Sequence, residues 1–227
     1  MISEKTLQFL QALKENNYRE WFHEHKTWYQ ESREDFIALV SAATGLVQKL
    51  DPNVGNPQPS DCIFRINRDI RFSPDKSPYK TNFGAYIATG GRKSSYAGYY
   101  VHIEPSGSFL AGGKYMPTPA ELKAIRGEIY YNPDDFLAMV NHKDFKKNFG
   151  SFTDSGKLKT APKGFPKDWE HIEWLRYKNY AVMKHVPDEI VTSPKFLDEV
   201  KATFAALLPV NKWLNFIASE AQGEGKL

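Results

Sequence analysis

The chain has 227 residues, of which 41% are hydrophobic and 14% aromatic, so it can bury a substantial core. Its 30 basic and 27 acidic residues leave a net charge of +3, which is too small to require a nucleic-acid partner. One cysteine, Cys62, excludes an intramolecular disulfide, and the lack of a long apolar run or signal-peptide pattern argues against a membrane protein. We therefore expect a soluble, cytoplasmic protein in which Cys62 is a buried structural thiol.

Two helices are predicted at the start of the chain. Ser3 can cap a first helix, which ends near Asn16 and has the apolar residues Leu7, Leu10 and Leu13. A longer helix ends before Asp51-Pro52. Its apolar residues recur at three- and four-residue steps and are Phe36, Leu39, Val40, Ala43, Leu46, Val47 and Leu50. The aromatic residues between the two helices are interpreted as packing residues, namely Trp21, Phe22, Trp28 and Tyr29.

The apolar pattern then changes to an alternation that predicts an antiparallel β-meander. The predicted strands are residues 62–66, 82–89, 97–104 and 108–112. Pro-Ser-Gly-Ser at 105–108 is a tight hairpin signal, whereas Gly-Gly-Arg-Lys-Ser-Ser at 90–95 predicts a longer hairpin loop.

Helices return after the predicted sheet. Three dipeptides combine a cap residue with a proline at the helix start: Thr118-Pro119, Asn132-Pro133 and Ser193-Pro194. Residues 180–186 predict one further strand, and the final long helix has an apolar face of Phe196, Val200, Phe204, Leu207 and Leu208. The predicted fold class is α+β, a central antiparallel β-meander flanked by N-terminal and C-terminal helices. We predict a single domain, with helices over about 3–50, the sheet over about 61–115 and the C-terminal part over about 118–220.

The run from Phe64 to Lys80, FRINRDIRFSPDKSPYK, is the most informative part of the chain. It holds five cations and two carboxylates, and the surplus of three charges equals the net charge of the whole chain. Pro74 and Pro78 reduce backbone freedom around these charges, which favours a preformed anion site over a solvated surface. Arg binds phosphate or carboxylate through paired N–H groups, whereas Lys supplies a flexible point charge.

This run also resembles the signature of a known family, domain of unknown function 2461, which comprises microbial conserved hypothetical proteins. Four other blocks are similar to that family: Asn16 to Phe22, Tyr99 to Ile103, Gly112 to Pro117, and Ile125-Arg126. The resemblance therefore spans nearly the whole chain. It implies no activity, substrate or catalytic residue, because none is established for the family, so any role must be argued from side-chain chemistry.

The predicted ligand-binding residues are Arg65, Asn67, Arg68, Arg71, Lys76, Tyr79 and Lys80. Asp69, Asp75 and His102 are candidate catalytic residues. In the alternative interpretation each aspartate pairs with a neighbouring cation and fixes the loop, Tyr79 anchors the loop to the sheet, and His102 is structural. The predicted strands that begin at Cys62 and at Ala97 each have one polar face. If both polar faces lie on the same side of the sheet, four polar side chains converge there: Arg65, Asn67, His102 and Glu104. The six histidines lack metal-ligand spacing, so we predict no metal and no cofactor.

Three functions remain open. The one we favour is binding of a phosphorylated or carboxylated small molecule through the charged run. The second is binding or processing of nucleic acid, in which the same cations contact phosphates and Tyr79 or Phe72 stacks on bases, with a positive surface that continues over the Lys-rich residues 143–167. The third is a structural or partner-binding protein in which the run is an internal salt-bridge network. The sequence specifies no oligomeric state.

Overall fold

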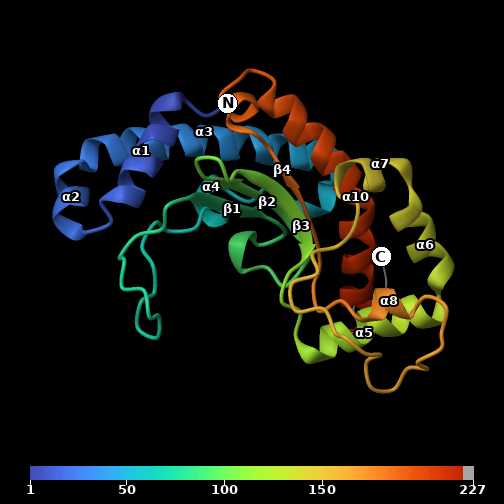
Figure 1. Ribbon diagram of the computed structural model, residues 1–227. Coiled ribbons are helices and arrows are strands. Elements are labelled where there is room, and N and C mark those ends of the chain that lie inside the picture. Colours follow the sequence, from blue (N-terminus) through green and yellow to red (C-terminus); the bar gives the residue numbers. More distant parts are fainter. Residues whose placement is uncertain (222–227) are drawn as a thin grey trace. The chain divides into compact units, whose positions relative to one another are not determined.

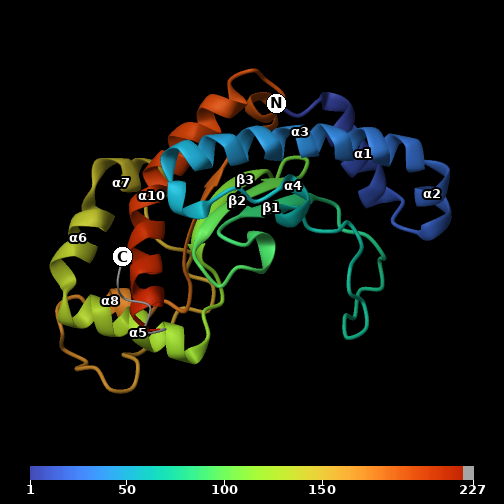
Figure 2. The same cartoon turned by 180° about the vertical axis from the view of Figure 1, so that it is seen from behind.

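The computed structural model describes residues 1–221 (Figures 1 and 2). The helices are α1 (Glu4–Glu15), α2 (Arg19–Glu24), α3 (Lys26–Leu50), α4 (Pro59–Cys62), α5 (Pro119–Tyr131), α6 (Pro133–Asn141), α7 (Lys143–Asn148), α8 (Ile172–Leu175), α9 (Asp188–Val191) and α10 (Phe196–Ala221), with 3₁₀ turns η1 (Pro52–Val54) and η2 (Gly91–Lys93). The strands are β1 (Phe83–Ile87), β2 (Gly98–Ile103), β3 (Phe109–Lys114) and β4 (Tyr180–His185), and they form one antiparallel sheet in the order β1-β2-β3-β4. The predicted α+β class is confirmed.

The described residues form two compact units. The first unit comprises Met1–Ser94, Tyr99–Leu110 and His185–Ala202, and the second comprises the remaining described residues. The single-domain organisation stays a prediction. No helix within residues 1–221 is long and apolar enough to cross a membrane.

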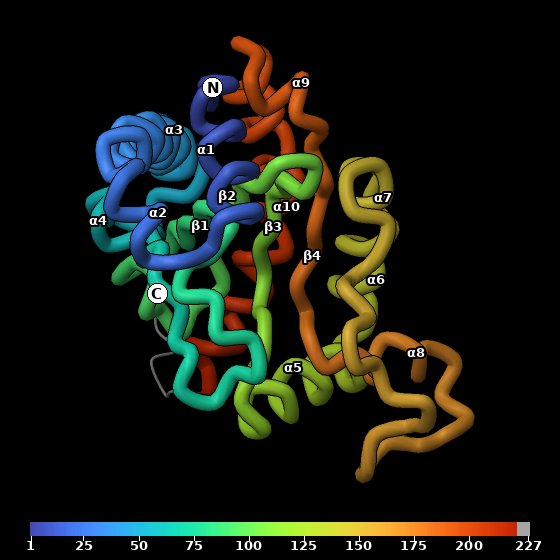
Figure 3. The backbone as a smooth tube through the Cα atoms, turned by 60° about the vertical axis from the view of Figure 1, so that its left-hand side comes forward, coloured from blue at the N-terminus to red at the C-terminus, as the bar shows by residue number. Residues whose placement is uncertain are grey.

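The first unit is built around a helix pair packed on β1 and β2. Helices α1 and α3 lie side by side in Figures 1 and 3. Phe83 of β1 stacks on Phe36 of α3, with ring centroids 5.3 Å apart, and on Phe9 of α1 at 6.5 Å. At the C-terminal end of α3, the buried carboxylate of Asp51 accepts a hydrogen bond of 3.0 Å from the hydroxyl of Tyr99. The apolar face predicted for α3 is therefore what holds the sheet.

The predicted strand at 62–66 is wrong. Pro59 begins the short helix α4, which ends at Cys62, because proline suits the first helical turn and cannot donate to a strand ladder. The following residues run along the edge of β1 with one isolated bridge, Ile63 to Ala85, and one bond from the Phe64 N–H to the Gly84 carbonyl at 2.9 Å. Residues 63–67, which we call the wall segment, are therefore extended but are not a strand.

After the wall segment the chain leaves the sheet as a long loop, residues 67–79, seen as the teal trace in Figures 1 and 2. Two backbone bonds close its base, from Arg68 to Pro78 at 2.9 Å and from Lys80 to Ile66 at 2.8 Å. Tyr79 is only 6% exposed and stacks on Phe22 at 4.0 Å. By contrast, the side chain of Phe72 in the same loop is 94% exposed.

In the second unit, α10 packs against β3 through glycines. A Cβ at Gly112 would lie 2.2 Å from the Leu207 side chain, so only glycine permits this approach. Asn211 is fully buried, accepts a bond from the Gly113 N–H and donates one to the Gly98 carbonyl, both at 3.0 Å. Gly112 thus serves the packing of α10, whereas Gly113, at φ +90°, allows the close approach of β4, because a Cβ there would lie 2.3 Å from the Tyr180 carbonyl oxygen.

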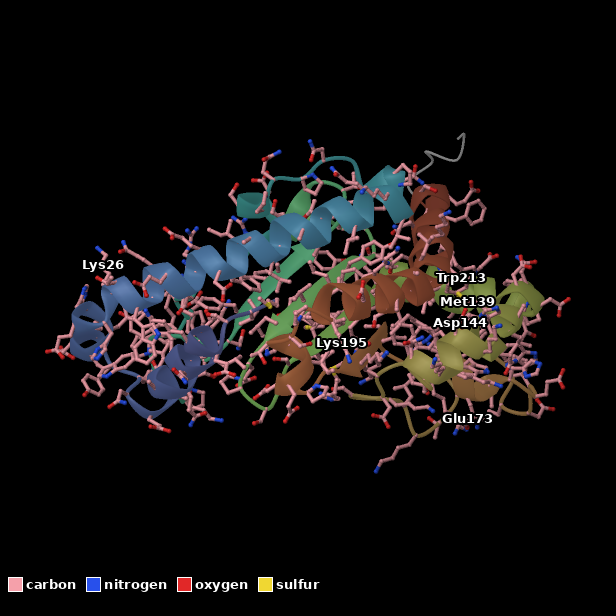
Figure 4. The ribbon with its side chains drawn as sticks, turned by 90° about the horizontal axis from the view of Figure 1, so that it is seen from above. Lys26, Met139, Asp144, Glu173, Lys195 and Trp213 are labelled. Atoms are coloured by element: carbon pink, nitrogen blue, oxygen red, sulfur yellow. The ribbon has the colours of Figure 1, made fainter. Side chains whose placement is uncertain are left out.

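The helix starts of the second half follow the predicted signals closely. Thr118 forms a complete capping box with Glu121 at the start of α5, and α6 begins at Pro133. The last helix begins at Phe196, two residues after the Pro194 signal. Within the second unit Trp213 of α10 packs on Phe136 of α6, with centroids 5.2 Å apart, and Figure 4 labels Trp213 and Met139 on these two helices.

Candidate anion-binding pocket

A pocket of about 530 Å³ lies in the first unit between the wall segment, α3 and η2. Its lining residues are Tyr29, Arg33, Ser60, Ile63, Phe64, Arg65, Ile66, Asn67, Lys80, Phe83, Arg92 and Lys93. Five of these are cationic, and none of them is Asp or Glu. The pocket thus combines a concentrated positive charge with a partly apolar lining.

Helix α3 brings two polar side chains to the pocket. Tyr29 and Arg33 are four residues apart, and Phe36 follows at a seven-residue spacing, so all three share one face of the helix. Phe36 is fully buried against β1, whereas Arg33 lies further toward the helix start and is exposed. The same stripe that packs the core therefore ends at the pocket.

The turn η2 supplies the next two cations. Gly91 has φ +74°, and a Cβ there would lie 2.6 Å from the carbonyl oxygen of Asp61 on α4. Only glycine allows the turn to approach α4 so closely. Arg92 then donates a hydrogen bond of 2.7 Å to the carbonyl of Ser60. This contact holds the guanidinium at the pocket and leaves its other N–H groups for a ligand.

The positive charge of the pocket is not balanced by the protein. Within residues 1–221, none of its five cations has a carboxylate within 4.0 Å. Lys80 is half-buried, and its ammonium lies 5.4 Å from the centroid of the Phe64 ring. Burial, and then the neighbouring Arg65 guanidinium, lower the pKa of Lys80. The free pocket therefore holds like charges close together.

The residues of the charged run divide into two groups. Three predicted ligand-binding residues line the pocket, namely Arg65, Asn67 and Lys80, whereas Arg68, Arg71 and Tyr79 are not part of its lining. Lys76 lines a second hollow of about 400 Å³ in the same unit, and its ammonium donates a 3.0 Å bond to the Ile70 carbonyl.

The two aspartates of the run form ion pairs within the loop. Asp75 accepts bonds from Arg68, from the Ser77 N–H at 2.9 Å and from the Ser77 hydroxyl at 2.7 Å. These bonds, with those of Ser77 the strongest cause, lower the pKa of Asp75 to about 2. Asp69 accepts two bonds from the Arg71 side chain, at 2.9 and 2.7 Å, and its pKa is lowered for that reason. Both carboxylates are therefore weak bases.

His102 belongs to a separate polar group on β2. Its Nε2 lies 3.1 Å from Glu104, which also accepts a 3.2 Å bond from Thr81, and its Nδ1 lies 3.1 Å from the Tyr100 hydroxyl. An ionised Glu104 can only accept, so Nε2 carries the proton and Nδ1 accepts from Tyr100. The expected convergence is only partial, because Arg65 and Asn67 line the pocket whereas His102 and Glu104 do not.

The chain shares its sequence pattern with one family of proteins. The model of the family described as conserved hypothetical protein (DUF2461) matches residues 5–213. The chain belongs to the DUF2461 family. The resemblance predicted from the sequence is thereby confirmed, and the charged run lies inside the matched region. No curated protein and no solved structure shows a significant match.

The cations that sequence reasoning missed in this DUF2461 protein are Arg33, Arg92 and Lys93. Arg33 stands three residues before Phe36 and therefore lies on the same face of α3. Extending the apolar stripe of this helix toward its start would have marked Arg33 as a cation on the face that packs against the sheet. The sequence pattern predicts a hairpin loop for Arg92 and Lys93, yet two glycines directly before two cations are also a signal for a close backbone approach. Among the described residues, no group of three or more His, Cys, Asp or Glu is placed to hold a metal ion.

His102 gives the DUF2461 protein a testable pH response. Burial lowers its pKa below the usual value of about 6.5, against the opposing effect of Glu104. A histidine with a lowered folded pKa binds fewer protons folded than unfolded, so its contribution to stability is lost as the pH falls below about 6.5. We expect NMR titration of the His102 ring to give a midpoint below about 6.5, and His102→Gln to flatten the loss of stability below pH 6.5. A midpoint above 6.5 would contradict the burial argument.

Proposed function

We propose that this protein binds a phosphorylated or carboxylated small molecule in the pocket between the wall segment, α3 and η2. The observation that carries the proposal is the set of five cations, from three separate parts of the first unit, around one pocket whose lining contains no carboxylate. Cations without carboxylate partners in a concave site attract an anion, because the ligand supplies the charge that the protein lacks.

A comparison of the paired and unpaired cations within the charged run favours this function over a purely structural role. In the loop, Arg68 and Arg71 are each paired with an aspartate a few residues away. Such pairing is the arrangement expected of a salt-bridge network. Arg65 and Lys80, from the same run, lack such pairs within residues 1–221 and face the pocket instead. We infer that the loop pairs shape the run and that the pocket cations serve a ligand.

The size of the pocket favours a small molecule over a nucleic-acid strand. A volume of about 530 Å³ falls within the range of small-molecule sites. The nucleic-acid alternative rests on Phe72, whose ring is 94% exposed and lies 5.9 Å from the Arg71 guanidinium. Bases stack on such rings, and binding of this kind weakens steeply with salt. The binding experiment therefore includes a short oligonucleotide.

The proposal is tested by calorimetric titration with inorganic phosphate, citrate and a short single-stranded oligonucleotide, at low and moderate salt. We expect saturable binding of at least one small anion. Arg65→Gln should weaken it about tenfold, since a charge-assisted hydrogen bond contributes roughly 1.5–3 kcal/mol. Arg71→Gln is the matched control, because this arginine belongs to the same run but pairs with Asp69 outside the pocket.

Three results would contradict the proposal. The first is that neither small anion binds. The second is equal weakening by Arg65→Gln and Arg71→Gln, which would indicate a general charge effect. The third is binding of the oligonucleotide alone, with a steep salt dependence, which would favour the nucleic-acid alternative.

A further inference from the structure

We propose that the ligand of this pocket is an organic diphosphate, in which two linked phosphates carry a flat ring, as in a nucleoside diphosphate. This inference rests on the proposed function and narrows its ligand class. It follows from the number of cations in the pocket, from their division between separate elements, and from the apolar part of the lining.

The charge count favours two phosphates over one anionic group. A carboxylate brings one negative charge and a phosphate monoester about 1.5 to 2, whereas the pocket lining holds five cations and no carboxylate. A single carboxylate would leave four of the cations without an anionic partner. A diphosphate ester carries about three negative charges, roughly one more than a monoester, and so comes closer to balancing the site.

The cations come from three separate parts of the chain. Arg65 and Lys80 belong to the wall segment and the end of the loop, and they are close enough for Arg65 to lower the pKa of Lys80. Arg92 and Lys93 are consecutive residues of η2, which is fixed against α4 by Gly91 and by the bond from Arg92 to Ser60. Arg33 comes from α3. Two cation pairs on different elements suit two linked anionic groups better than one.

The remaining lining accounts for the organic part of the ligand. Inorganic pyrophosphate is small compared with a pocket of about 530 Å³, and five lining residues present carbon surface: Tyr29, Ile63, Phe64, Ile66 and Phe83. Ile66 and Phe83 are 5% and 3% exposed, so they belong to the buried part of the lining. Tyr29 and Phe64 are half-buried aromatic residues of the lining, which offer carbon surface on which a ring can stack.

The test compares the dissociation constants of ADP, AMP, pyrophosphate, adenosine and citrate at constant ionic strength. We expect ADP to bind at least about tenfold more tightly than AMP, because the second phosphate gains charge-assisted hydrogen bonds from the second cation pair. Pyrophosphate should bind more weakly than ADP, and adenosine should not bind. Removing one cation of a pair, by Lys93→Gln or by Lys80→Gln, should reduce the preference for ADP over AMP to less than about threefold. Lys76→Gln, outside this pocket, should leave the preference unchanged.

The possible results distinguish failure of the diphosphate inference from failure of the anion site on which it rests. Equal affinities for ADP and AMP, or tighter binding of citrate than of ADP, would overturn the diphosphate inference and leave an anion site in place. Pyrophosphate binding as tightly as ADP would overturn the role of the ring. Failure of every phosphate compound and of citrate to bind would overturn the anion site itself. Melting curves of each variant confirm that a loss of binding reflects the pocket and not unfolding.

Discussion

Replacing Tyr79 with alanine is expected to lower the free energy of unfolding by about 3 kcal/mol, as for other large aromatic residues removed from a core. The ring is 6% exposed and stacks on Phe22 at 4.0 Å, so its removal leaves a cavity beneath the loop. The backbone of Tyr79 is also held by Asn17, which accepts from its N–H at 3.0 Å and donates to its carbonyl at 2.9 Å. Urea unfolding followed by tryptophan fluorescence measures the change.

Phe72→Ala is the matched control, because it removes an aromatic ring from the same loop. Phe72 is 94% exposed, so this change should alter the free energy of unfolding by less than about 0.5 kcal/mol. Similar losses from both variants would show that the loop folds onto the protein in a different way. A negligible loss from Tyr79→Ala would contradict the anchoring role of the ring.

Gly91→Ala is expected to destabilise the protein by about 3 kcal/mol and to weaken anion binding about tenfold or more. The alanine would have to adopt φ +74°, and its Cβ would lie 2.6 Å from the Asp61 carbonyl oxygen. Because that oxygen belongs to the backbone, the turn η2 itself must move away from α4. Arg92 and Lys93 then leave the pocket together. Unfolding in urea measures the first effect, and calorimetric titration with phosphate measures the second.

Gly90→Ala separates the two causes of this loss. Gly90 also has a positive φ, +80°, but a Cβ at this position would meet no atom within 4 Å. We expect only the cost of the left-handed backbone, about 1 kcal/mol, with little change in anion affinity. If both variants lost stability and affinity equally, the approach of η2 to α4 would have no role in positioning the cations.

Most of the fold was predictable from local sequence signals. The apolar stripe of α3, the helix start at Thr118-Pro119 and the alternation in β2 are all local patterns, and each was confirmed. The prediction of a strand at 62–66 is wrong for a physical reason. An alternating pattern indicates which side chains are buried, but it does not indicate whether the backbone pairs with a neighbouring strand. Cys62 and Ile66 are indeed buried, yet Pro59 had already started a helix.

The candidate site was predictable only in part. The charged run drew attention to Arg65 and Lys80, which line the pocket, because an excess of cations is visible in the sequence. The sequence does not reveal which cations are already paired with a carboxylate, and this distinguishes Arg68 from Arg65. Arg33 and Arg92 reach the pocket from distant segments, so a local pattern can draw attention to each of them but cannot show that they meet Arg65 and Lys80.

Cys62 gives the protein a built-in measure of local opening next to the pocket. It is the only cysteine in the chain, it is fully buried, and it directly precedes the wall segment. Burial raises the pKa of its thiol to about 11, so the closed state reacts very slowly with alkylating reagents. The alkylation rate of the unmodified protein therefore reports the transient local opening that exposes Cys62 at the end of α4. A ligand that bridges the wall segment and η2 should slow this reaction in proportion to its occupancy of the pocket, without any engineered label.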